Sequence, residues 1–420
     1  MTQRDAALAG KITKAMTLAA QKEGLAPEAI RRGLAEGTLV VPANPGHVNL
    51  EPAAIGKGVR VKINANIGTS PHDVSLEKEQ AKLAAALRYG ADAVMDLSTG
   101  GDLDALRTAL ISQCPAPFGT VPIYQVMTEA NSLDEVKGDW FLEMVEHHAR
   151  QGVDFVTVHC GVTRKALPLL AKRVTGVVSR GGAFLTAWMR RHQRENPLYE
   201  QYDRLLQIAK AHDVTLSLGD GLRPGCLADA TDRAQLHELK ILGELTKRAW
   251  AQGVQVMVEG PGHLPLKAIK KNVRLQQKYC ANAPFYVLGP LVTDVASGYD
   301  HIAGAIGGAL AATEGASFLC YVTPAEHLKL PEVEDVIDGV VASRIAAHAA
   351  DIANGIPGAA DWDLSMSKAR RALDWPAQIR LSINPDKAKR YRDLSRAQED
   401  QCTMCGKFCA MKVFDEKFES

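Results

Sequence analysis

Three cysteines near the end of the sequence could bind a metal centre. They are Cys402, Cys405 and Cys409, with two residues between the first pair and three between the second. Three thiolates on one short loop can hold three irons of a four-iron, four-sulfur (4Fe-4S) cluster. The fourth iron then has no protein ligand, and such an open iron is a reaction site. The spacing therefore favours a 4Fe-4S cluster with one open iron.

Structural zinc is the alternative for the same cysteines. Such a site needs four ligands that leave no open position. No histidine follows His348, so a local site of three cysteines and one histidine is impossible. Asp415 or Glu416 could supply a fourth ligand, although carboxylates are uncommon in structural zinc sites. The cluster is the favoured interpretation, and zinc stays open.

A short polar segment in the middle of the chain could bind phosphate. Residues 179–182, Ser-Arg-Gly-Gly, offer a hydroxyl, a guanidinium and unhindered backbone N–H groups, which suit a phosphate monoester. Arg223 lies three residues after Asp220. It could bind the phosphate or ribose of the same ligand, or it could form a salt bridge with Asp220. Both interpretations stay open.

Two histidines could bind a second metal. His263 and His327 each follow a turn rich in Gly and Pro, and Glu259 lies four residues before His263. Neutral imidazole suits Zn, Fe and similar ions, so two converging histidines predict one divalent metal, Zn or Fe, with open positions. The alternative is that each histidine only hydrogen-bonds a carbonyl group.

A regular alternation of strands and helices must position these residues. From Val59 the chain repeats a short apolar strand followed by an amphipathic helix. We predict strands at 59–67, 93–98, 120–125, 155–160, 176–180, 215–219, 255–259, 284–288 and 317–322. We predict helices at 75–89, 335–354 and 364–373 and from Asn384 onward. The pattern indicates an α/β fold, a (β/α)8 barrel with one strand too many, and a doubly wound sheet is the alternative.

The expected chain has three parts. Residues 1–58 form an N-terminal appendage, 59–330 the catalytic barrel, and 331–420 a helical region that ends in the cluster-binding tail. Ligands of a parallel barrel bind at the C-terminal ends of its strands. Gly and functional side chains gather just there, at 63–68, 94–100, 122–125, 158–161, 179–182, 219–225, 259–263 and 323–327. These segments therefore predict one active site at that rim.

Composition excludes several classes of protein. The 420 residues are 46% hydrophobic and 23% charged with a net charge of +1, so no charge excess indicates nucleic acid or an anionic membrane. Charged residues interrupt the first twenty positions, and no apolar run is long enough to span a bilayer. The other cysteines stand singly in apolar segments, which is typical of reduced thiols in a cytoplasmic protein.

The chain resembles the phosphomethylpyrimidine synthase (ThiC) family over nearly its whole length. Matching segments lie at 62–68, 95–100, 119–124, 178–182, 217–225, 259–263, 284–291, 298–301 and 320–324 and in the cysteine tail. The resemblance implies a radical S-adenosylmethionine (SAM) enzyme of thiamine biosynthesis. Its expected reaction rearranges 5-aminoimidazole ribotide into 4-amino-5-hydroxymethyl-2-methylpyrimidine phosphate with release of formate and carbon monoxide. The reduced cluster would cleave SAM to a 5′-deoxyadenosyl radical.

The resemblance also assigns the site residues. We expect Glu259, His159 and Asp220 to be catalytic, His263 and His327 to hold the divalent metal, and the three tail cysteines to hold the cluster. The expected substrate-binding residues are Asn66, Met95, Tyr124, His159, Ser179, Arg180, Gly181, Asp220, Gly221, Leu222, Arg223, Glu259 and Tyr286. The family further implies a homodimer with exchanged C-terminal tails and an external one-electron reductant such as flavodoxin or ferredoxin.

Two departures from the family pattern leave alternatives open. Three residues rather than four separate Cys405 from Cys409, and Cys160 replaces the usual alanine after His159. A cysteine there is typical of 5-hydroxybenzimidazole synthase, a paralogue that uses the same ribotide to make a cobamide lower-ligand precursor. Segments 219–225 and 95–97 instead match the pyrimidine synthase. Alternatives of other classes are a zinc-dependent barrel hydrolase and a non-catalytic interaction protein with a zinc tail.

Overall fold

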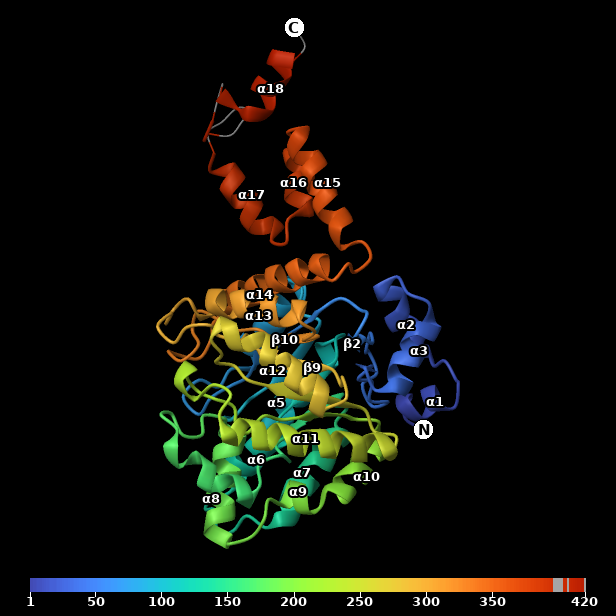
Figure 1. Cartoon of the computed structure of the whole chain (residues 1–420), viewed down its shortest axis with the longest axis vertical. Coiled ribbons are helices and arrows are strands. Elements are labelled where there is room, and N and C mark those ends of the chain that lie inside the picture. The colour runs from blue at the N-terminus through green and yellow to red at the C-terminus, as the bar shows by residue number, and fades with distance from the viewer. Residues whose placement is uncertain (396–402, 406–407, 419–420) are drawn as a thin grey trace. The chain divides into compact units, whose positions relative to one another are not determined.

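Eight parallel strands close into a barrel in the larger of two compact units (Figure 1). The computed structural model describes residues 1–395, 403–405 and 408–418, and the units are Met1–Asp351 and Ile352–Ser420. The strand order is β10-β3-β4-β5-β6-β7-β8-β9, and the pairing of β10 with β3 completes the ring. The predicted (β/α)8 barrel is confirmed, and the doubly wound sheet was the wrong alternative.

The barrel strands are short and buried. They are Lys62–Ile67 (β3), Ala93–Asp96 (β4), Phe118–Thr120 (β5), Phe155–Val158 (β6), Thr215–Leu218 (β7), Val256–Gly260 (β8), Phe285–Leu288 (β9) and Phe318–Cys320 (β10). Burial on both faces is typical of parallel strands that helices cover. The rings of Phe155 and Phe318 come from opposite sides of the ring of strands and lie 6.3 Å apart. Aromatic side chains therefore fill the barrel interior.

Helices follow the strands and form the outer layer of the barrel. They are Leu76–Arg88 (α4), Leu103–Gln113 (α5), Pro122–Glu129 (α6), Gly138–Arg150 (α7), Arg180–His192 (α8), Pro197–Glu200 (α9), Tyr202–His212 (α10), Arg233–Ala251 (α11), Leu266–Tyr279 (α12), Asp300–Thr313 (α13) and Val333–Ala353 (α14). The predicted N-cap of α4 is present, since the Ser75 side chain accepts a hydrogen bond from the Lys78 N–H. None of the described helices is long and apolar enough to cross a membrane.

Two strand predictions were wrong. Residues 176–180 are not a strand, because Ser179 is the N-cap of α8 and its side chain accepts from the Gly182 N–H. This segment is the surplus ninth candidate. The strand predicted at 120–125 instead ends at Thr120, and Pro122 begins α6. Proline preorganises the first position of a helix, and this signal outweighed the apolar run that follows it.

An N-terminal segment packs its own small core beside the barrel. It contains helices Gln3–Leu8 (α1), Lys14–Glu23 (α2) and Pro27–Glu36 (α3) and the antiparallel pair Leu39–Val40 (β1) and Ile55–Gly56 (β2). Buried polar contacts fasten it to the barrel. Asp154 accepts hydrogen bonds from the Asn44 and Phe118 backbone N–H groups and pairs with His47 Nδ1 at 2.7 Å. The bonds of Asn44 and His47 to Asp154 join residues more than 100 positions apart.

The second unit is helical where it is described. It contains Ala359–Arg371 (α15), Trp375–Leu381 (α16), Pro385–Asp393 (α17) and Ala410–Phe418 (α18). The helix predicted from Asn384 is present and its N-cap is Asn384, whose side chain accepts from the Lys387 N–H. Cys402 lies outside the described residues, Cys405 is exposed and Cys409 is half-buried. The division at 58 and 330 stays a prediction.

We expect Asp213 to make stability depend on pH. Its carboxylate accepts from the Gln3 N–H at 2.9 Å, and burial raises the pKa of Asp213 to about 7. A raised folded-state pKa favours the protonated form, so this stabilisation is complete below pH 4 and is lost between about pH 4 and 7. Asp213→Asn cannot ionise, and Asn tolerates the left-handed backbone found there (φ 50°). The variant should unfold with about 2–4 kcal/mol more free energy than the unaltered chain above pH 7.

The measurement is urea denaturation at pH 5 and pH 8, with Asp203→Asn as the control. Asp203 lies on the same helix, and its side chain is 76% exposed beside Arg248. Such a surface pair contributes about 0–1 kcal/mol. An equal effect of Asp213→Asn at both pH values would contradict the prediction.

Candidate active site

Two adjoining cavities open at the C-terminal ends of the barrel strands. Their volumes are about 90 and 580 Å³, and they share Asn66, Tyr124 and Arg223 among their lining residues. The smaller cavity is lined by these predicted substrate-binding residues: Asn66, Met95, Tyr124, His159, Asp220, Arg223, Glu259 and Tyr286. The barrel therefore brings together side chains from seven separate regions of the sequence. Their roles in binding stay predictions.

Glu259 is a half-buried carboxyl group at the end of β8. Its Oε1 accepts hydrogen bonds from the hydroxyls of Thr157 at 2.6 Å and Ser217 at 2.7 Å. Burial raises the pKa of Glu259, and the two hydroxyls oppose that shift. Asp220 lies nearby and pairs with Arg223 Nη1 at 3.2 Å. Burial raises the pKa of Asp220 to about 8, although Arg223 acts in the opposite direction. Neutral and ionised carboxyl groups are therefore both accessible near neutral pH.

Side-chain amides organise a second part of the wall of the small cavity. Asn64 Nδ2 donates to Asn66 Oδ1 and to the Tyr286 hydroxyl, both at 2.7 Å. Asn66 Nδ2 donates to Cys320 Sγ at 3.0 Å, and the Tyr286 hydroxyl lies 3.5 Å from Met95 Sδ. The network fixes the orientation of the Asn66 amide and the Tyr286 ring.

His159 contacts the start of α8. Its Nε2 lies 3.3 Å from Ser179 Oγ, and a Cβ on Gly181 would lie 2.4 Å from its ring. Glycine is therefore required at this position. Burial, aided by the charge of Arg223, lowers the pKa of His159 to about 3, so the imidazole is neutral. His159 Nδ1 and Asp220 Oδ2 are buried without a hydrogen-bond partner among the described residues. A polar ligand in the cavity would supply such partners.

The N-terminus of α8 offers an anion site on the wider cavity. Arg180 is exposed there, and its guanidinium lies 4.3 Å from the centre of the Tyr124 ring. A Cβ on Gly182 would lie 2.0 Å from the Gly221 carbonyl oxygen, so the loop at 221 approaches the helix start closely. Unpaired backbone N–H groups and the helix dipole favour a phosphate at such a terminus.

Leu222 is predicted to contact substrate, yet its side chain is fully buried and lines neither cavity. Its backbone N–H instead donates to Glu238 Oε2 at 2.8 Å. Glu238, on α11, was missed by the sequence analysis because it lies in the middle of an ordinary helix. Burial raises its pKa well above the usual range. A cavity of about 20 Å³ between Glu238, Asp220 and Glu259 can hold one water molecule.

His263 and His327 are brought together as predicted from their turns. Their ring centres lie 5.5 Å apart, and Asp294 Oδ1 lies 2.9 Å from His263 Nδ1. Burial lowers the pKa of His263, which favours the neutral imidazole that metals bind. Among the described residues, no group of three or more metal-binding side chains is present. The predicted metal therefore stays a proposal.

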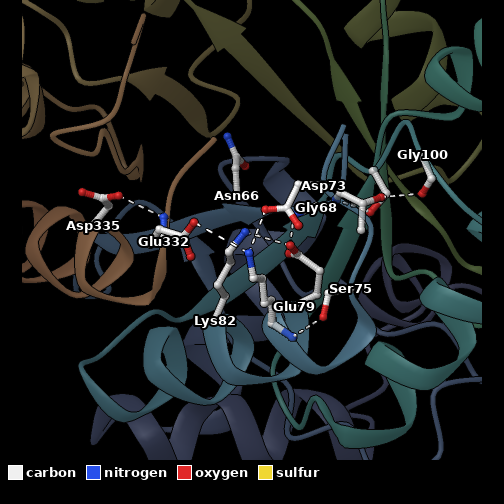
Figure 2. A network of polar contacts seen from close by, with 12 residues as sticks. Asn66, Gly68, Asp73, Ser75, Glu79, Lys82, Gly100, Glu332 and Asp335 are labelled. Atoms are coloured by element: carbon white, nitrogen blue, oxygen red, sulfur yellow. Dashed lines mark hydrogen bonds and ion pairs between the residues drawn. The ribbon is translucent and has the colours of Figure 1, made fainter. Parts of the chain in front are cut away.

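The sequence analysis also missed an ion pair at the edge of the wider cavity (Figure 2). Lys82 Nζ lies 2.8 Å from Glu79 Oε1, and both side chains are buried. Glu79 Oε2 accepts from the Gly68 N–H at 2.7 Å, and Lys82 lines the cavity. Two charges three positions apart on a helix look like a surface pair, so only their burial could reveal them.

A closed parallel barrel whose strand ends carry an anion site and buried carboxyl groups belongs to the class of barrel enzymes with a small-molecule substrate. The model of the radical SAM ThiC family matches residues 2–416, and the chain belongs to that family. The predicted family and the predicted class of enzyme are confirmed.

Proteins named phosphomethylpyrimidine synthase are similar to this chain throughout. The one from Desulforamulus reducens is 59% identical over 98% of this chain and 97% of its own length. The one from Geobacter metallireducens is 57% identical over 100% of this chain and 98% of its own length. A third, from Thermoanaerobacter sp., is 56% identical over 99% of this chain and 98% of its own length.

We expect Glu238 to hold the loop at 220–223 through the Leu222 N–H. Glu238→Leu removes the acceptor and should speed amide hydrogen exchange in 219–225 by about 5- to 100-fold, because an unpaired buried N–H costs about 1–3 kcal/mol. Glu238→Gln is the matched control, since its side-chain oxygen can still accept and the neutral amide resembles the protonated acid. Equal exchange rates in the two variants would show that this bond does not hold the loop.

Proposed function

We propose that this chain is a phosphomethylpyrimidine synthase. The reaction converts 5-aminoimidazole ribotide to 4-amino-5-hydroxymethyl-2-methylpyrimidine phosphate, formate and carbon monoxide by radical SAM chemistry. The observation that carries the proposal is identity of 55–59% to proteins of that name over 98–100% of this chain. The cavities at the barrel mouth support it, because they offer both a helix start suited to an anion and a pocket with several ionisable side chains in its lining.

The substrate would bind across both cavities. Its phosphate fits the start of α8, where the Arg180 side chain and the backbone N–H groups of residues 180 and 181 are available. Its ribose and aminoimidazole would extend from there toward the smaller cavity, where His159 Nδ1 and Asp220 Oδ2 lack partners among the described residues. Glu259 is held by two hydroxyls and can accept or donate a proton with little movement. Hydrogen bonding and proton exchange with the substrate would account for the predicted catalytic roles of His159, Asp220 and Glu259.

The cysteines of the tail fit the expected cluster as far as they are described. Cys405 and Cys409 are free thiols, and neither is fully buried. Thiolates are the usual ligands of a 4Fe-4S cluster, and SAM would take the open iron. When bound, the cluster and SAM supply one-electron chemistry that side chains cannot perform. The barrel residues bind and orient the substrate, and they exclude water from it.

The pyrimidine product is favoured over 5-hydroxybenzimidazole. Cys160 is the residue that suggested the paralogue, but it is fully buried and lines neither cavity. Its side chain belongs to the hydrophobic core. A substitution that does not contact the substrate is weak support for a different product. The residues that do line the cavity include Met95, Asp220 and Arg223, from the segments that match the pyrimidine synthase.

Turnover by the reconstituted protein tests the function. After anaerobic reconstitution with iron and sulfide, the protein with SAM, dithionite and the ribotide should form 5′-deoxyadenosine and the pyrimidine phosphate, detected by mass spectrometry. Cys405→Ala should abolish both products because it removes a cluster ligand. Cys226→Ala is the matched control, since Cys226 is half-buried and lies outside both cavities.

Each alternative gives a different result in that assay. A benzimidazole product would assign the paralogous activity to this chain. A colourless protein that forms no 5′-deoxyadenosine would contradict radical chemistry. Activity that depends on zinc alone would support the hydrolase, and absence of all turnover together with bound zinc would support an interaction protein.

A divalent metal on His263 and His327 is part of the proposal. Asp294 holds His263 Nδ1 and thereby leaves its Nε2 for a metal, as carboxylates behind metal-binding histidines often do. We expect His263→Ala/His327→Ala to lose one non-cluster metal ion per chain in elemental analysis. His72→Ala is the control, because His72 is exposed and lines neither cavity. Unchanged metal content in the double variant would make the pair a structural contact.

We also propose the homodimer with exchanged tails and a flavodoxin- or ferredoxin-type reductant. Helices α16 and α17 bury none of their residues, and Tyr391 and Leu394 are 65% and 76% exposed. Apolar side chains exposed on short helices are available to a partner chain. These exposed side chains support the dimer. The proposed reductant rests on the family resemblance alone.

A further inference from the structure

Lys82 carries a buried positive charge at the edge of the wider cavity. It lies on α4, directly after the first barrel strand, and is 2% exposed. Glu79 is its one hydrogen-bond partner among the described residues, at 2.8 Å. An ammonium group has three N–H donors. A buried ammonium with donors to spare is costly unless another acceptor is supplied.

Glu79 accepts one of the three N–H groups of Lys82, and its two oxygens are shared between Lys82 and the backbone. Oε2 accepts the Gly68 N–H at 2.7 Å, and Oε1 accepts from Lys82. The pair thereby fixes the position of the ammonium group relative to the end of β3, as Figure 2 shows. Burial raises the pKa of Glu79, and Lys82 opposes that shift. The arrangement orients a cation beside the cavity.

The cavity beside Lys82 has room and polar groups for a second ligand. Its volume is about 580 Å³, and Gly68, Thr69, Ser70 and Thr99 lie among its lining residues. Lys82 is more buried than the other Lys and Arg residues of this cavity. The side chains of Arg223 and Lys329 are 24% and 55% exposed and Arg180 is exposed, whereas the Lys82 side chain is 2% exposed. Lys82 is thus the buried cation of this cavity with donors left for a ligand.

Lys82 and the phosphate site belong to different sides of the barrel mouth. Lys82 follows β3 and Arg180 follows β6, and the strand order places two strands between β3 and β6. In the proposed function the substrate phosphate lies at the helix start beside Arg180. An ammonium with free N–H groups binds carboxylates and phosphates alike, as a point charge. With the phosphate assigned to α8, Lys82 is left for a second anionic ligand.

We propose that Lys82, oriented by Glu79, binds the carboxylate of the amino acid half of SAM. The inference rests on the proposed function, in which SAM is the ligand that carries an α-amino acid. A carboxylate has two oxygens, so it can accept from Lys82 while its other oxygen binds elsewhere. Formate, the carboxylate product, is the other source of the same chemistry.

The test compares SAM with decarboxylated SAM, which differs only in the missing carboxylate. Both are titrated by calorimetry into the cluster-reconstituted full chain without reductant, so that no turnover occurs. Glu79→Gln/Lys82→Met removes both charges and avoids an unpaired buried carboxylate. It should reduce the preference for SAM over the decarboxylated ligand by about 10- to 100-fold, because a charge-assisted hydrogen bond is lost. Affinity for the decarboxylated ligand should stay within about threefold.

Glu79→Gln is the matched control for the double variant. It keeps the ammonium and an acceptor for Gly68, so it should retain most of the preference for SAM. Lys82→Arg keeps the charge and should recover part of the preference. Thermal unfolding of each variant shows that the fold is intact at the titration temperature. Glu79→Gln should unfold at a lower temperature than the double variant, because it leaves the buried ammonium without its counter-charge.

Three results would overturn the inference. A double variant with an unchanged preference shows that Lys82 does not contact the carboxylate. Equal loss of affinity for both ligands shows a structural role. Competition by formate that disappears in the double variant, with the SAM preference intact, assigns the site to the product. If the unaltered protein binds neither SAM ligand, the proposed function fails as well.

Discussion

Parallel pairing of β10 with β3 closes the barrel, and every feature of the candidate site depends on that closure. Because all eight strands point the same way, their C-terminal ends meet at one mouth. Asn66 and Cys320 are 254 positions apart, yet Asn66 Nδ2 lies 3.0 Å from Cys320 Sγ. Without the pairing of β10 with β3, Asn66 and Cys320 would no longer lie together.

Burial of charge is the second constraint on the site. Water is removed from Glu259, Asp220 and Glu238, and burial raises the pKa of each. The protein compensates with donors that are fixed before any ligand arrives, including two hydroxyls on Glu259 and the Leu222 N–H on Glu238. Fixed donors do not need to reorganise during a reaction, which is how preorganised sites lower barriers.

Missing side chains are as important as those present. The start of α8 lies close to His159 and to the loop at 221. There is no space for a methyl group on either Gly181 or Gly182. This close approach places the N-terminus of α8 beside a neutral imidazole. An alanine at either position would force the helix start away from the wall of the small cavity.

The sequence by itself determined the barrel, the family and most of the cavity lining. Alternating apolar strands and amphipathic helices carry a periodic signal, and polar residues after strands such as 93–96 and 256–260 must face the mouth of a parallel barrel. Strand predictions failed where an apolar run overlapped a signal for the start of a helix, as at Pro122 and Ser179. The cluster motif stays a prediction, since Cys402 lies outside the described residues.

Only the tertiary structure decided which polar groups are buried and which of them meet. Glu238 and Lys82 lie in ordinary helical patterns, and their importance comes from partners or cavities that the fold brings to them. Leu222 and Cys160 lie in motifs at the mouth, but their side chains turn into the core. Side-chain direction within a loop depends on contacts with distant segments. Neighbouring residues in the sequence do not determine the direction of such a side chain, because the packing that determines it forms only when the barrel closes.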